Sequence, residues 1–213
     1  MQNIKELPTE ELFIRILDIL DFERNRGRLV KYLDAQSAPE SYAVNFWAYV
    51  FKLIFAGDTY SIDHEVPPGK YNTRRRIDLV VEELMERQFK LKFQAILFAE
   101  GKKNNASEND LTIAESQAWT GAEEFYQLGE GAPQALAMTF YGTRARFWLF
   151  DHDRLDTMLE EVLPLVQGGK STYLDIRANK RAFASIFAAI IKNSIPDLFT
   201  AKQIAESINR QQV

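Results

Sequence analysis

The spacing of hydrophobic residues changes partway along the chain, and this change limits the folds that the sequence can adopt. In several segments between residues 9 and 57, apolar side chains recur every three or four positions, the period of a helix buried on one side. From residue 59 to residue 102 the pattern becomes alternating or continuously apolar, as in strands. Helical spacing returns over 110–128, and two more strand-like segments follow. This order predicts an α/β protein with a mixed central β-sheet flanked by helices.

The individual elements are expected at the following positions. Apolar spacing and turn residues predict helices at 9–22, 28–33, 40–57, 110–128, 154–166, 178–192 and 200–209. Strands are predicted at 59–66, 76–82, 93–102, 135–141 and 144–151. Gly142-Thr143 joins the last two strands and predicts a β-hairpin. The charged segment 83–92 is interpreted as a turn or a short helix.

The length of the chain fits one folding unit. A protein of 213 residues can bury about 70% of the surface that its unfolded chain exposes. We therefore interpret 1–213 as a single domain. Its N-terminal helical extension covers 1–39, the sheet with its flanking helices covers 40–151, and C-terminal helices cover 152–213.

Composition argues against several kinds of catalytic or metal site. The chain has no cysteine, which excludes disulfides, thiolate zinc sites and cysteine nucleophiles. It has two histidines, His64 and His152, too few to favour a histidine-rich metal cage or a histidine-based triad. A metal bound by this chain is therefore expected to be a hard cation held by carboxylates.

Charge and hydropathy indicate where the protein acts. The chain has 26 Lys and Arg against 30 Asp and Glu, a net charge of −4, which argues against a uniformly basic nucleic-acid binder but allows a local basic groove. The apolar runs 95–99 and 186–191 are far shorter than the ~20 residues of a membrane span. Acidic residues near the start are unlike a secretory signal. We expect a soluble intracellular protein, cytoplasmic or nuclear, with no signal peptide and no membrane contact.

The strand predicted at 93–102 ends in polar residues that packing does not require. Alternation along a strand places Glu100 and Lys102 on one face, and the preceding strand supplies Asp78, 22 positions before Glu100. If the two strands are neighbours, the two carboxylates and the lysine come together. Two carboxylates and a strand carbonyl suit Mg²⁺, and an adjacent ammonium can help to deprotonate a metal-bound water.

This Asp…Glu-x-Lys arrangement, with a helix before it and another after it, resembles the PD-(D/E)XK nuclease superfamily over roughly 40–151, about half the chain. The resemblance implies a restriction-endonuclease-like fold. It also implies that Asp78 and Glu100 bind Mg²⁺ or Mn²⁺ together with the carbonyl of Gly101, and that Lys102 serves the attacking water. Ile77 stands where the family motif has proline, a common departure from the motif.

Two further catalytic residues follow from the same resemblance. The first core helix of the family often contributes a glutamate, which maps here to Glu40, and Glu65 could equally be this extra acid. The helix after the motif often contributes a glutamine, which maps to Gln117. Four residues later the chain has Gly121 where the recombination-type exonucleases have tyrosine, so that variant is not supported.

Basic residues close to the motif predict contacts with nucleic acid. The residues expected to contact phosphates lie shortly before Asp78 and directly after Lys102: Lys70, Arg74, Arg75, Arg76 and Lys103. Arg144 and Arg146 alternate on a later strand. They would either extend this basic rim or serve as solubilising charges at a sheet edge.

The leading hypothesis is a metal-dependent nuclease that hydrolyses phosphodiester bonds of DNA with a metal-activated water, with Mg²⁺ or Mn²⁺ as cofactor. The alternative is a catalytically silent nuclease fold that binds nucleic acid or a protein partner. A third hypothesis is a helical interaction protein in which the acidic residues are coincidental. The sequence does not distinguish DNA from RNA or endonuclease from exonuclease action, and it leaves open whether the protein forms a homodimer.

Overall fold

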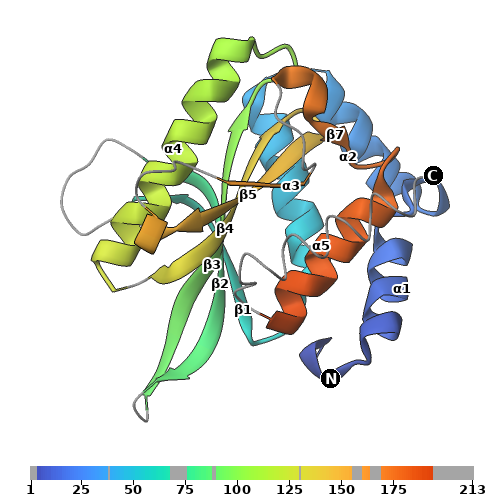
Figure 1. The fold of residues 1–213 in the computed structure, drawn as a ribbon. Helices are drawn as coiled ribbons and strands as arrows, with labels where there is room; N and C mark the ends of the chain where they lie inside the picture. The colour runs from blue at the N-terminus through green and yellow to red at the C-terminus, as the bar shows by residue number, and fades with distance from the viewer. Residues whose placement is uncertain are drawn as a thin grey trace.

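The computed structural model describes residues 4–37, 39–67, 76–87, 90–129, 131–154, 160–163 and 169–193. Within these ranges the chain forms an α/β fold in which a mixed β-sheet is flanked by helices, as the sequence predicted (Figure 1). The helix predicted at 200–209 lies outside the described residues.

The described part of the chain has five α-helices, four short 3-10 helices and seven strands. The helices are α1 (Thr9–Ile19), α2 (Arg26–Gln36), α3 (Glu40–Ile54), α4 (Glu108–Gln127) and α5 (Lys180–Asn193). The strands are β1 (Tyr60–Val66), β2 (Ile77–Arg87), β3 (Lys90–Lys102), β4 (Gly131–Tyr141), β5 (Arg144–Asp151), β6 (Glu160–Leu163) and β7 (Leu174–Asp175).

The sheet has the strand order β1-β2-β3-β4-β5-β6, and β7 pairs with β5. All neighbouring strands are antiparallel except β3 and β4, which are parallel. α4 connects these two strands, as a parallel pair requires a crossover. The start of β2 and the end of β3, which carry the candidate catalytic residues, therefore lie inside the sheet and beside the start of a helical crossover.

Helices cover both faces of the sheet (Figure 1). α4 packs on one face against β3 and β4, whereas α3 and α5 lie over the other face and α1 packs on α5. The larger hydrophobic core includes the ring contacts of Trp47 with Phe46 and of Phe51 with Phe187. A smaller cluster lies under α4, where the rings of Phe98 and Phe125 are 5.1 Å apart. Because side chains alternate along β3, the positions two and four residues after Phe98 also face α4.

Local sequence signals account for two connections near the strand ends. α4 begins at a capping box: Asp110 donates its backbone N–H to the hydroxyl of Ser107, and Ser107 donates its own N–H to the Asp110 carboxylate. The predicted β4–β5 hairpin turns at Gly142, whose φ of +54° suits glycine. Trp47 of α3 donates to the carbonyl of Gly142 at 3.0 Å and ties this turn to the helical layer.

The prediction of a turn or short helix at 83–92 is wrong. β2 continues to Arg87 and β3 begins at Lys90, and the two strands form a long antiparallel ribbon (Figure 1). Beyond Glu83 this ribbon extends past the described ends of β1 and β4. Both of its faces are then largely solvated, so charged side chains are compatible with strand structure there.

The helix predicted at 154–166 is also wrong where the structure describes it. Residues 160–163 form β6, which pairs with the end of β5 and buries Val162 in the larger core. Together with β7 this strand means that the region 152–213 is not wholly helical. Pairing with an existing sheet edge outweighed the helical spacing of a short segment.

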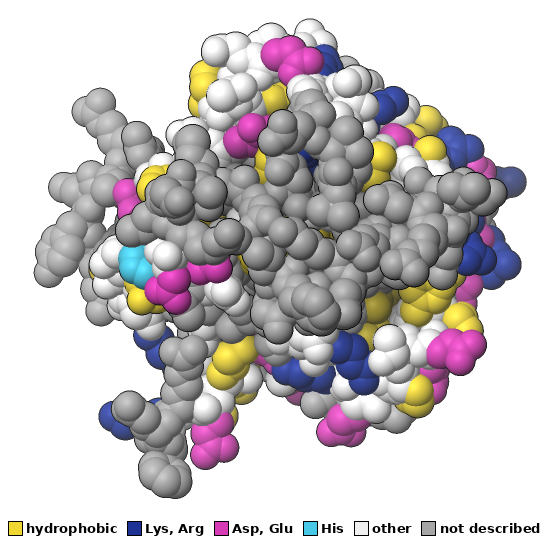
Figure 2. Space-filling model, in the orientation of Figure 1, with side chains coloured by type: hydrophobic (Ala, Val, Ile, Leu, Met, Phe, Trp, Pro, Cys, Tyr) yellow, Lys and Arg dark blue, Asp and Glu magenta, His cyan; other side chains and the backbone are white. Residues whose placement is uncertain are grey.

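Charge on the visible surface is mixed. On the face shown in Figure 2, acidic and basic side chains both appear around the periphery, separated by polar and hydrophobic ones. This distribution agrees with a net charge of only −4. In the described part of the chain, no helix combines the length and the apolar character needed to cross a membrane.

Candidate active site

Asp78 and Glu100 lie across from each other on two neighbouring strands. β2 and β3 are antiparallel, and the pairing of Leu79 with Ala99 places residue 78 opposite residue 100. The backbone N–H of Gly101 donates to Oδ2 of Asp78 at 2.7 Å. In return, the backbone N–H of Asp78 donates to the Glu100 carboxylate. The strand ends thus hold the two carboxylates by reciprocal backbone hydrogen bonds.

Burial makes both carboxylic acids unusually hard to ionise. Glu100 is only 3% exposed, and desolvation, followed by repulsion from Asp78, raises its pKa to about 9. Desolvation raises the pKa of Asp78 to about 6, and the charge of Glu40 adds to this rise. The hydrogen bond from Gly101 and the ammonium of Lys102 act in the opposite direction on Asp78. A pair of buried carboxyl groups with raised pKa values is typical of functional sites.

Lys102 is held by the glutamine that the family resemblance singled out. Its Nζ donates to Oε1 of Gln117 on α4 at 3.0 Å. The charge of Lys102 lowers the pKa values of both Asp78 and Glu100. The structure therefore brings these four residues into one neighbourhood, from two strands and the helix that follows them.

The two carboxylates open onto different cavities. Asp78 lines a cavity of about 330 Å³ together with residues of α3 and β1: Glu40, Ser41, Val44, Asn45, His64 and Glu65. Glu100 lines a cavity of only about 10 Å³ on the α4 side, with Arg76, Ile77, Gln117, Thr120, Gly121 and Glu124. Both candidates for the additional acid, Glu40 and Glu65, thus share the cavity of Asp78.

The backbone of Glu65 adopts an uncommon conformation. Its φ is +48°, although it is not glycine and lies within β1. The ladder between β1 and β2 pairs His64 with Leu79 and Val66 with Ile77, and it omits Glu65. Arg76 donates to the Glu65 carbonyl at 3.1 Å. Such local strain beside a cavity is a reason to examine the residue for a functional role.

Two glycines around the site allow neighbouring side chains to pack directly against the backbone. A Cβ at Gly101 would lie 2.4 Å from the ring of Phe140, so no side chain fits there without displacing the ring. A Cβ at Gly121 of α4 would lie 2.3 Å from the side chain of Ile77, the residue before Asp78. Close packing thus explains why glycine occupies both positions.

The predicted basic rim is described only in part. Arg76 and Lys103 are exposed, as a phosphate-contacting role requires. Lys70, Arg74 and Arg75 lie outside the described residues. Of the two arginines on β5, Arg144 is exposed.

Arg146 is buried and does not belong to this rim. Its side chain is 2% exposed and lies over the ring of Trp148, 4.2 Å from the ring centroid. Alternation along β5 predicted that Arg146 and Arg144 share a face of the sheet. It could not predict that α4 and its neighbours cover the part of that face where Arg146 lies.

Sequence reasoning missed Glu124, which lines the small cavity with Glu100. Its Oε2 is buried and has no hydrogen-bond partner within the described structure. The spacing of Gln117, Gly121 and Glu124 along α4, four and three residues, places them on one helix face, so this signal was present in the sequence.

The donor set fits a hard divalent cation. Asp78 and Glu100 supply carboxylate oxygens, the type of ligand that Mg²⁺ prefers. Burial raises the pKa values of both groups, and a bound cation would favour their ionised forms. Within the described ranges, no three histidine or acidic side chains gather closely enough to form a complete metal site by themselves. Water and backbone oxygens would therefore complete the coordination.

Comparisons with known proteins give no match to this chain. No family model matches it, and neither the curated proteins nor the solved structures contain a match. The functional argument therefore depends on the residues and their geometry.

Proposed function

We propose that this protein is a metal-dependent nuclease that hydrolyses phosphodiester bonds of DNA. The observation that carries the proposal is the buried pair Asp78 and Glu100 on neighbouring strands, with the ammonium of Lys102 close to both. The resemblance of these three residues to the PD-(D/E)XK motif supports the same assignment. The parallel pairing of β3 with β4 through α4 adds support, because it fixes a helix directly over the motif.

The cofactor in this proposal is Mg²⁺ or Mn²⁺. Asp78 and Glu100 would hold the ion, with the carbonyl of Gly101 as a further ligand. When bound, the cation would lower the pKa of a coordinated water and offset negative charge on the phosphate.

The chain's own residues have separate roles around this ion. The ammonium of Lys102 would assist deprotonation of the attacking water and offset charge on the phosphate, and Gln117 keeps it in place through the 3.0 Å hydrogen bond. Glu40 or Glu65, which line the cavity of Asp78, would add a further carboxylate close to the reacting phosphate. Besides burial, the charge of Glu40 raises the pKa values of both Asp78 and Glu100, which favours Glu40 for this role.

Substrate binding is assigned to the basic residues around the motif. Arg76 and Lys103 are exposed and lie close to the motif in the sequence, and Lys70, Arg74 and Arg75 belong to the same proposal from their place in the sequence. Phosphate contacts of this kind position the substrate without reading its sequence. With DNA as substrate, the protein would act inside the cell, in the cytoplasm or the nucleus.

A cleavage assay tests the proposal. Purified protein is incubated with single-stranded, double-stranded and flapped DNA, and with RNA, in Mg²⁺, in Mn²⁺ and in EDTA. We expect cleavage of DNA with either metal and none in EDTA. Asp78→Asn and Glu100→Gln should abolish cleavage, whereas Glu86→Gln, on the exposed part of the β2–β3 ribbon, should not. Cleavage that survives the first two substitutions would contradict the proposal.

A second function is favoured by one observation. Asp78 and Glu100 line separate cavities, an arrangement expected if this site no longer assembles around a metal ion. The protein would then be a silent nuclease fold that binds nucleic acid or a protein partner. Absence of cleavage with any divalent metal, together with retained binding to nucleic acid, would select this alternative.

A further inference from the structure

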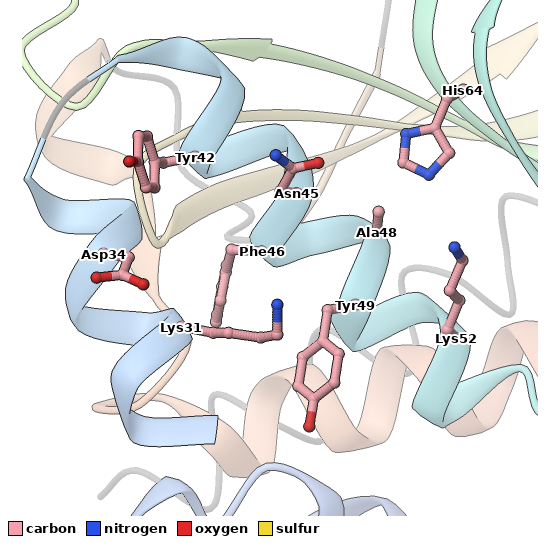
Figure 3. Close-up of a pocket in the computed structure, with 9 residues that line it drawn as sticks. All are labelled: Lys31, Asp34, Tyr42, Asn45, Phe46, Ala48, Tyr49, Lys52 and His64. Atoms are coloured by element: carbon pink, nitrogen blue, oxygen red, sulfur yellow. The ribbon is translucent and has the colours of Figure 1, made fainter. Parts of the chain in front are cut away.

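A third cavity, of about 370 Å³, lies between α2 and α3, next to β1 (Figure 3). Its lining combines basic, aromatic and amide side chains: Lys31, Tyr42, Asn45, Tyr49, Lys52 and His64. Asp34 is the acidic residue in the lining. None of these residues has a role in the proposed metal site.

One face of α3 supplies most of this lining. Tyr42, Asn45, Tyr49 and Lys52 follow one another at intervals of three, four and three residues, so they form a stripe along the helix. The stripe is about 15 Å long, since a helix rises about 1.5 Å per residue. Lys31 of α2 faces this stripe across the cavity, and its Nζ lies 4.9 Å from the ring centroid of Tyr49. The cavity is thus a groove with aromatic rings and ammonium groups along its length.

This groove adjoins the cavity of Asp78. Asn45 and His64 line both cavities. A strand lying along α3 would therefore extend from the lysines toward the carboxylates. The charge changes along the way, from Lys31 and Lys52 at one end to Glu40, Glu65 and Asp78 at the other.

The chemistry of the groove fits an unpaired nucleotide strand. Phosphates are attracted by lysines, and unpaired bases stack on aromatic side chains. Tyr42 is 47% exposed, so its ring is accessible to a ligand. In a duplex the base faces are stacked on each other and are not free to stack on a tyrosine, which makes a single strand the better occupant.

We propose that this groove, formed by Lys31, Tyr42, Tyr49, Lys52 and His64, binds single-stranded nucleic acid and leads it to Asp78. The inference deepens the proposed nuclease function, because it names the strand state of the substrate and the path by which it reaches the carboxylates. Lys31 and Lys52 contact phosphates, and Tyr42 stacks on a base. The position of the groove also assigns a role to α2, which belongs to the N-terminal helical extension.

The test measures binding separately from cleavage. Fluorescence anisotropy follows a fluorescein-labelled oligothymidylate bound to the full chain in EDTA, over a series of salt concentrations. Tyr42→Ala should weaken binding by about 5- to 100-fold, whereas Tyr42→Phe should keep most of the affinity because the ring face remains. Lys31→Ala and Lys52→Ala should each reduce the slope of log affinity against log salt by about 0.7. Lys90→Ala, on the exposed β2–β3 ribbon, removes the same charge as a control and should have little effect.

The outcomes separate this inference from the nuclease proposal. If the wild type binds the oligonucleotide through these residues but cuts nothing with any metal, the groove is supported and the nuclease proposal fails. If the wild type cuts DNA while Tyr42→Ala and Lys52→Ala bind the oligothymidylate as Lys90→Ala does, the groove assignment is overturned and the nuclease proposal remains. Absence of any binding to the oligothymidylate also overturns the assignment and would point to a protein ligand. Melting temperatures of the variants confirm that each is folded, which is expected because Tyr42, Lys31 and Lys52 are all exposed.

Discussion

The backbone N–H of Gly101 donates a 2.7 Å hydrogen bond to the carboxylate of Asp78. This bond links the two halves of the candidate motif, because Gly101 lies between Glu100 and Lys102. A hydrogen bond to the ionised form favours ionisation, yet the pKa of Asp78 is still raised to about 6 by burial. Ionising this carboxyl pair in the folded protein therefore costs free energy, and this cost has measurable consequences.

The first prediction concerns the pH dependence of stability. The pKa of Glu100 is raised from 4.5 to about 9 by folding, so the folded protein binds the extra proton over this range. Its stabilising contribution is complete below about pH 4.5 and is lost as the pH rises toward 9. Glu100→Gln removes this loss, so its melting temperature in EDTA should exceed that of the wild type by an amount that grows up to pH 9. At about 2–4 °C per kcal/mol for a chain of this size, thermal unfolding can resolve the difference.

Asp78→Asn provides an internal comparison. Because the pKa of Asp78 rises only to about 6, the advantage of this variant should develop between about pH 4 and 6 and then stay constant. Glu86→Gln changes an exposed carboxylate on the same ribbon and should follow the wild type at every pH. If the melting temperatures of the wild type and Glu100→Gln change in parallel with pH, Glu100 does not have the raised pKa.

The second prediction concerns metal affinity. A cation can bind Glu100 only after the carboxyl group loses its proton, so binding should release a proton and strengthen as the pH rises from 6 toward 9. Mn²⁺ should raise the melting temperature of the wild type more at the upper end of this range, because it stabilises the folded state by mass action. Glu100→Gln should lose most of this response. If Mn²⁺ raises the melting temperature of the wild type equally at pH 6 and at pH 9, a metal site at Glu100 is contradicted.

The third prediction separates catalysis from metal binding. Lys102→Ala should lower the turnover number on the order of 10²-fold or more, because the lysine acts on the phosphate and the water. The melting-temperature response to Mn²⁺ should remain. Gln117→Leu should cause a smaller loss, since Lys102 keeps its charge but loses the partner that positions it. Loss of the Mn²⁺ response in Lys102→Ala would show that the lysine supports the site structurally.

The fourth prediction concerns the basic rim. Arg76→Ala should weaken binding of single-stranded DNA and reduce the slope of log affinity against log salt by about 0.7, the effect of one phosphate contact. The KM for cleavage should rise while kcat changes little. Arg15→Ala on α1 serves as the matched control, because it removes an exposed arginine that is far from Arg76 in the sequence. Equal salt slopes for the two variants would remove Arg76 from the DNA interface.

Much of the fold could be predicted from the sequence, because hydrophobic period is a local property. Changes in the spacing of hydrophobic residues located α3, β1, α4 and the β4–β5 hairpin within a few residues. The ribbon beyond Glu83 was missed because its charged residues are acceptable in a strand only if both faces are solvated, which depends on where the neighbouring strands end. β6 was missed because the edge of β5 that it pairs with is a tertiary feature.

The candidate site was likewise predictable from the sequence only in part. Alternation and order along the chain placed Asp78, Glu100 and Lys102 on neighbouring strand ends, and the structure adds the Gln117 hydrogen bond. The groove along α3 could not be found from the sequence, because Lys31 reaches it from a different helix. The burial of Arg146 was missed for a related reason: strand alternation gives the face of a residue but not what covers that face.

The absence of a side chain at Gly121 sets the distance between α4 and the start of β2, where Ile77 fills the space that a methyl group would need. Gln117 lies one helical turn before this point of contact. A larger residue at 121 would push the helix outward and carry the Gln117 amide away from Lys102. The distance between α4 and the sheet thus fixes the position of Lys102. The size of the side chain at position 121 therefore affects catalysis in the proposed nuclease, although glycine carries no chemical group of its own.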